Sequence, residues 1–103
     1  MFTSKKRSKP AEKDIYRALP RRALERGKAI AERYQIKLWR EDGHWFGVGV
    51  EEPGTYGDGR TLQQCVHNLR EALAVGVAWN IEDGLPVAEP IIDQERRAGR
   101  KAG

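Results

Sequence analysis

Apolar and polar residues recur with a helical period between residues 62 and 78. The apolar positions are Leu62, Cys65, Val66, Leu69, Ala72, Leu73, Gly76 and Val77, and the polar side carries Gln63, Gln64, His67, Asn68, Arg70 and Glu71. Thr61 directly precedes this pattern and Gln64 follows three residues later, which is the spacing of a capping box. The sequence therefore predicts an amphipathic helix with Thr61 as its N-cap, half-buried on another element.

A second pattern, in residues 34–50, is typical of a β-hairpin. The stretches YQIKLW and HWFGVGV are rich in β-branched and aromatic residues, and the Asp42-Gly43 pair between them favours the positive φ angles of a tight turn. The implied cross-strand pairs are Leu38 with Gly47, Trp39 with Phe46, and Arg40 with Trp45.

Both faces of this hairpin are largely apolar. One face carries Ile36, Leu38, Gly47 and Gly49, and the other carries Trp39, Phe46, Val48 and Val50. The helix over 62–78 can cover the first face, where the glycines would allow close approach. The second face requires the N-terminal helix, a second copy of the chain or a partner. We therefore expect a homodimer or a larger assembly.

Residues 14–33 have apolar positions at helical spacing, with Pro20 tolerable in the first turn, and this predicts an N-terminal amphipathic helix. Residues 1–13 are polar and basic, which predicts a disordered tail. A chain of 103 residues has room for one domain. The expected organisation is a tail over 1–13, a single α+β domain over 14–92 made of a small antiparallel sheet and one crossing helix after the N-terminal helix, and a charged tail over 93–103.

The net charge of +4 conceals an uneven distribution. Residues 1–33 carry +7, residues 34–92 carry −5 and residues 93–103 carry +2. Basic ends attract polyanions, so Arg21, Arg22 and Lys28 on the polar side of the N-terminal helix are candidate nucleic-acid-binding residues. The acidic middle attracts a basic surface instead. For any single charged residue, a solvated position is the simpler interpretation.

The candidate chemical groups are few and isolated. Cys65 lies on the apolar side of its helix, and His67 points to a different side, so packing in the core is favoured over catalysis. His44 and His67 lack further ligands at metal-binding spacing, and GTYGDG lacks the ending of a phosphate-binding loop, which favours a turn. We expect no catalytic residue, metal or cofactor, and no enzyme activity. No apolar run approaches the roughly 20 residues of a membrane span, so a cytoplasmic protein without a membrane partner is expected.

Residues 34–90 resemble the HicB family of antitoxins from toxin–antitoxin systems. The resemblance depends on DGHWFGVGVEEPGTYGDGRTLQQCVHNLREAL followed by EDGLPVAEP. The positions that match the family pattern are Pro53, Gly54, Gly59, Thr61, Asn68, Arg70, Glu71, Ala72, Leu73, Gly84, Pro86, Glu89 and Pro90.

This resemblance implies a partial ribonuclease-H-like fold without the metal-binding acids of the nucleases. It also implies that the chain binds a small basic HicA-type toxin, which cleaves RNA with a histidine, and blocks its active site. An acidic body suits such a partner, because complementary charge speeds encounter. The candidate toxin-binding residues are Glu51, Glu52, Tyr56 and Asp58, which we expect in a strand end and an exposed loop just before the capped helix.

The chain departs from the family pattern at both ends. Many HicB proteins carry a C-terminal DNA-binding domain, whereas DQERRAGRKAG is too short for one, and the basic N-terminal segment is extra. The alternative function is therefore a nucleic-acid-binding transcriptional regulator, with DNA bound through that N-terminal segment.

Overall fold

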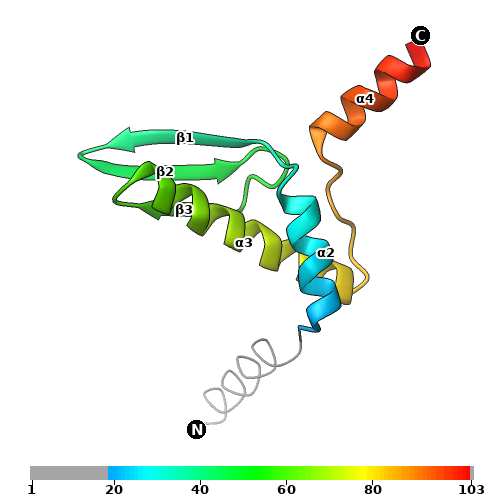
Figure 1. Ribbon diagram of the computed structural model, residues 1–103, viewed down its shortest axis with the longest axis horizontal. Coiled ribbons are helices and arrows are strands. Elements are labelled where there is room, and N and C mark those ends of the chain that lie inside the picture. Colours follow the sequence, from blue (N-terminus) through cyan, green and yellow to red (C-terminus); the bar gives the residue numbers. More distant parts are fainter. Residues whose placement is uncertain (1–18, 103) are drawn as a thin grey trace, which may run out of the picture.

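The computed structural model describes residues 19–102, which form a small α+β fold. A three-stranded antiparallel open sheet, in the order β1-β2-β3, packs against a long helix, and two further helices lie beside and beyond it (Figure 1). The elements are α2 (Arg21–Ala31), β1 (Ile36–Glu41), β2 (His44–Gly49), β3 (Tyr56–Gly59), α3 (Leu62–Glu82) and α4 (Ile91–Ala102).

Strands β1 and β2 form the predicted hairpin. Asp42 and Gly43 have φ angles of 50° and 77°, as a two-residue turn with two positive φ angles requires. The predicted register is confirmed, since Leu38 pairs with Gly47, Trp39 with Phe46 and Arg40 with Trp45. The turn chemistry thus determines which residues share a face of the sheet.

Strand β3 corrects the prediction of a turn and an exposed loop over residues 56–59. These residues pair with β2, with Tyr56 opposite Val48 and Asp58 opposite Phe46. A Cβ atom on Gly57 would lie 2.7 Å from the backbone of Leu69 in α3. The glycines that resemble turn residues in the sequence therefore allow the strand to lie directly against the helix.

Helix α3 begins as predicted and extends four residues further. The Thr61 hydroxyl accepts a hydrogen bond from the Gln64 backbone N–H at 3.1 Å, which confirms the cap. The helix continues to Glu82 and therefore includes Trp79.

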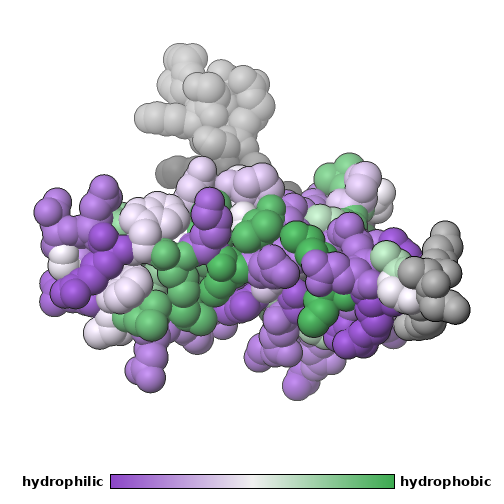
Figure 2. Space-filling view, turned by 90° about the horizontal axis from the view of Figure 1, so that it is seen from above, coloured by the Kyte–Doolittle hydropathy of each residue, from purple (hydrophilic) through white to green (hydrophobic). Residues whose placement is uncertain are grey.

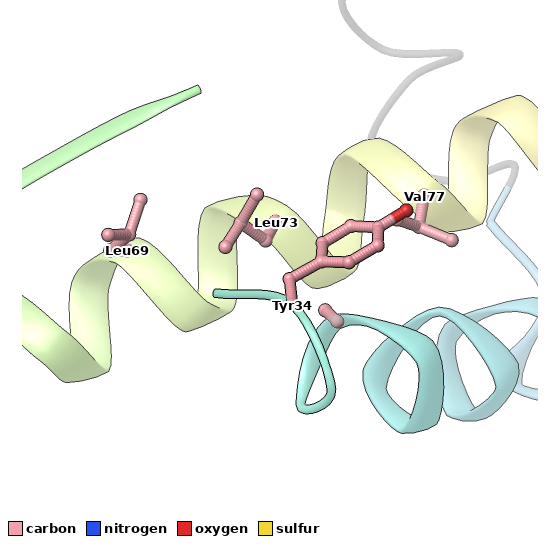
Figure 3. Packing of buried hydrophobic residues seen from close by; sticks show 5 residues of the cluster. Tyr34, Leu69, Leu73 and Val77 are labelled. Atoms are coloured by element: carbon pink, nitrogen blue, oxygen red, sulfur yellow. The ribbon is translucent and has the colours of Figure 1, made fainter. Parts of the chain in front are cut away.

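The hydrophobic core lies between α3, the sheet and the segment after α2 (Figure 3). Its buried members are Ala31, Tyr34, Leu69, Leu73 and Val77. Leu69 and Leu73 pack against Gly47 and Gly49 of β2, as the close approach expected for this face requires.

Helix α2 packs on α3 and makes no contact with the sheet. It lies within the segment predicted to be helical, while residues 14–18 of that segment and the predicted tail over 1–13 are outside the described residues. Arg70 of α3 donates hydrogen bonds from Nη1 to the carbonyl oxygens of Ala31 at 2.8 Å and Tyr34 at 2.7 Å. This guanidinium thereby adds a second donor to the Ala31 carbonyl, which also accepts from the Tyr34 N–H at 3.1 Å, and holds the Tyr34 carbonyl just after α2.

Most of the segment expected to be a charged tail forms α4, which projects away from the sheet and α3 (Figure 1). Its first turn is attached to the body at two points. The Ile91 N–H donates to Glu51 Oε2 at 2.8 Å, and Arg33 Nε donates to Asp93 Oδ2 at 3.1 Å. The Arg33 guanidinium lowers the pKa of the Asp93 carboxyl below its ordinary value.

Candidate protein-binding surface

The strand register divides the sheet into two chemically different faces. The inner face carries Ile36, Leu38, Gly47, Gly57 and Gly59 toward α3. The opposite face, called the outer sheet face below, carries Lys37, Trp39, Glu41, His44, Phe46, Val48, Tyr56 and Asp58. Among residues 19–102, α3 is the only helix that contacts the sheet, and it does so on the inner face. The outer sheet face is therefore uncovered by any described element.

Aromatic side chains occupy the centre and one side of the outer sheet face. Trp39 stacks on its cross-strand neighbour Phe46, with ring centroids 6.0 Å apart and an interplanar angle of 23°. Trp39 is 40% exposed and Tyr56 is 66% exposed. Together with Asp58, these three aromatic residues line an open hollow of about 200 Å³. Exposed aromatic residues beside a hollow are typical of surfaces that bind another protein.

The polar groups of this face are held by specific contacts. His44 Nε2 lies 2.8 Å from Asp58 Oδ2, a distance at which the ring nitrogen donates a hydrogen bond to the carboxylate. The His44 ring also lies against Phe46, with centroids 5.1 Å apart. On the other side of Asp58, Asn68 Nδ2 of α3 donates to its backbone oxygen at 2.8 Å. Asp58 is thus positioned through both its side chain and its backbone.

The four predicted toxin-binding residues do not form one surface. Tyr56 and Asp58 lie together on the outer sheet face. Glu51 is occupied within the chain, because its Oε1 accepts from the Gln35 N–H and its Oε2 from the Ile91 N–H, both at 2.8 Å. Glu51 therefore connects the start of β1 with the start of α4, and its replacement would disturb the fold.

Glu52 lies near the phenol of Tyr34, whose hydroxyl donates to the Ala88 carbonyl oxygen at 2.7 Å. Burial raises the pKa of Tyr34 to about 12, with smaller contributions from the negative charges of Glu52 and Glu51. The register thus places Trp39 and His44, and neither Glu51 nor Glu52, on the outer sheet face with Tyr56 and Asp58. Side chains alternate between the two faces along β1 and β2, which places Trp39 and His44 on one face. Their grouping with Tyr56 and Asp58 could be predicted only after residues 56–59 had been recognised as a strand.

The predicted nucleic-acid-binding residues are exposed on α2 but interleaved with acids. Arg21 pairs with Glu25 at 3.3 Å, and Lys28 lines a groove between α2 and α3 together with acidic residues. This groove has a volume of about 390 Å³ and is lined by Leu24, Lys28, Glu32, His67, Arg70, Glu71, Ala74 and Val75. Arg22 lies instead beside Arg26, around a smaller hollow. The structure therefore places the three basic residues on two different sides of α2.

Cys65 packs in the core, as predicted, and is fully buried beside Gly57. Burial raises the pKa of its thiol, which favours the unreactive protonated form. Within residues 19–102, no three potential metal-ligating side chains come together.

Comparison with models of protein families, with curated proteins and with solved structures finds no match to this chain. In the part of the chain that the structure describes, no helix has the length and apolar character needed to cross a membrane.

Proposed function

We propose that this chain is a HicB-like antitoxin that binds and neutralises a small basic RNA-cleaving toxin. The observation that carries the proposal is the exposed outer sheet face, with Tyr56 and Asp58 side by side on β3. A large exposed aromatic ring next to a carboxylate suits a basic partner, because the ring supplies apolar contact area and a cation-binding face while the carboxylate pairs with an Arg or Lys.

The charge of the surrounding body supports the same partner. Residues 34–92 carry −5, and the outer sheet face itself has two acids, Glu41 and Asp58, and one basic residue, Lys37. Complementary charge raises the association rate and helps to exclude acidic partners. Asp58 is held by His44 and Asn68, so little side-chain freedom is lost on binding.

Four of the positions that match the HicB pattern have structural roles in this chain, so they support the proposed fold rather than the proposed binding. Thr61 caps α3, Asn68 holds β3, Arg70 holds the end of α2 and Leu73 is in the core. A HicB-like, partial ribonuclease-H-like fold is part of the proposal. The binding function depends on the outer sheet face.

A growth assay tests this function. The toxin is a small basic HicA-type protein, expressed alone or with this chain. Wild-type chain should restore growth, and the double variant Tyr56→Ala, Asp58→Lys should fail to do so with an unchanged circular dichroism spectrum. Glu95→Lys, which makes the same charge change on exposed α4, should neutralise like wild type. Full neutralisation by the double variant would refute the proposal.

A further inference from the structure

The two edges of the sheet differ in how they are covered. At the β3 edge, the outward carbonyl of Asp58 is occupied by the Asn68 amide of α3. At the other edge, β1 has β2 as its only strand neighbour among residues 19–102, and it forms the outermost strand of the sheet (Figure 1). Seen from the side on which β1 lies, the surface has apolar side chains in a band between hydrophilic groups (Figure 2).

The register shows which backbone groups of β1 make no hydrogen bond to β2. Glu41 and His44 flank a two-residue turn, so they form a hydrogen-bonded pair. From this pair, hydrogen-bonded and non-hydrogen-bonded residue pairs alternate along β1 and β2. The bond from the Val50 N–H to the Gln35 carbonyl, at 2.9 Å, agrees with this alternation. The N–H and C=O groups of Ile36, Leu38 and Arg40 therefore point away from β2, and such an edge is a template for another strand.

The side chains of β1 are complementary to a second, antiparallel copy of β1. If Trp39 lies opposite Trp39 of the second copy, Lys37 lies opposite Glu41 of that copy, and the twofold axis generates the same pair again. These would be non-hydrogen-bonded pairs, in which facing side chains come closest. Leu38 and Arg40 would then exchange the backbone hydrogen bonds.

Other registers lose this complementarity. A shift by two residues in one direction places Arg40 opposite Arg40 of the second copy. A shift in the other direction places Lys37 opposite Trp39 and leaves Glu41 without Lys37. Only the register centred on Trp39 combines two Lys–Glu pairs with an aromatic pair.

We propose that two copies of this chain pair through their β1 edges, in the register centred on Trp39, to form a continuous six-stranded sheet. This interface differs from the face-to-face assembly that the hairpin pattern predicts, and it requires no toxin. Tyr56 and Asp58 lie on β3, at the edge of each sheet away from the β1 interface, and stay accessible. Because one strand pair buries less than the roughly 1,200 Å² of a tight interface, the expected dissociation constant is micromolar.

Sedimentation of the full chain at up to about 200 μM, well above a micromolar dissociation constant, tests the pairing by charge exchange. Wild type should dimerise, and Lys37→Glu or Glu41→Lys should each raise the dissociation constant about tenfold or more, because each creates two like-charge pairs. The double variant Lys37→Glu, Glu41→Lys should restore the wild-type constant. An equimolar mixture of the two single variants should form heterodimers.

A second pair of variants tests whether the dimer forms through the β1 edge or through the outer sheet face. Arg40→Pro removes an outward N–H from β1 without removing a bond to β2, and should leave the chain monomeric. Tyr56→Ala alters the exposed face of β3 and should dimerise like wild type. A monomeric wild type, single charge variants that dimerise as strongly as wild type, or a double variant that fails to recover would each overturn the proposal.

Discussion

Replacement of Gly57 by alanine should strongly destabilise the fold, because β3 lies in backbone contact with α3. The added Cβ would lie 2.7 Å from both Cα and N of Leu69. Since carbon contacts are optimal at about 3.5–4.0 Å, the strand and the helix would have to separate by about 1 Å. Neither neighbour is a flexible side chain that can rotate away. The cost should therefore lie in the upper half of the overpacking range, at about 2–3 kcal/mol.

Thermal unfolding followed by circular dichroism measures this cost. In a domain of this size each kcal/mol changes Tm by roughly 4–8 °C, so Gly57→Ala should lower Tm by about 10 °C or more. Gly76→Ala is the matched control, because its Cβ would meet no atom within 4 Å and it lies inside α3. This control should raise stability by roughly 0.5–1 kcal/mol. Equal unfolding of Gly57→Ala and wild type would refute the packing of β3 on α3.

Three further predictions concern stability. Thr61→Ala should cost about 0.5–2 kcal/mol in urea unfolding, because Gln64 N–H loses its acceptor; an unchanged midpoint would show that the cap contributes nothing. Arg70→Met should cost about 1.5–3 kcal/mol, since Ala31 and Tyr34 lose a charged donor, and a midpoint equal to wild type would contradict this. Between the ordinary Tyr pKa of 10 and about 12, only the unfolded state loses the Tyr34 proton, so stability should fall as pH rises through this window; Tyr34→Phe should reduce that fall, and an equal fall would disprove the assignment.

The local features of the fold were predictable because their signals are short in sequence. Asp42-Gly43 determines the hairpin register, and Thr61 with Gln64 determines the start of α3. Both depend on residues within a few positions of one another, so backbone geometry and capping chemistry suffice to read them.

The missed features depend on contacts between distant residues. YGDG has turn composition, and it becomes a strand because α3 lies directly beneath its glycines. Glu51 resembles a free surface acid, yet its two N–H partners are 16 and 40 residues away. The charged segment of α4 has little apolar surface to reveal a helix that stands apart from the sheet.

Only part of the candidate site was predicted, because its residues come together through the pairing of strands that are distant in the sequence. Tyr56 and Asp58 were selected from exposure and charge, and they do share a face. Trp39 and His44 join them only through the β1-β2-β3 order, which requires β3 to be recognised as a strand. Glu51 and Glu52 were grouped with them by proximity in sequence, whereas Glu51 accepts from the Gln35 N–H and the charge of Glu52 helps to raise the pKa of Tyr34.

Binding of a basic protein partner to the outer sheet face can be located residue by residue in an NMR titration. The ¹⁵N-labelled chain would be titrated with a catalytically inactive HicA-type protein. Binding at the outer sheet face should cause the largest chemical-shift changes at the Trp39 indole and at the amides of Tyr56 and Asp58, with little change in α4. Changes confined to α2 or α4, or no binding at all, would contradict it.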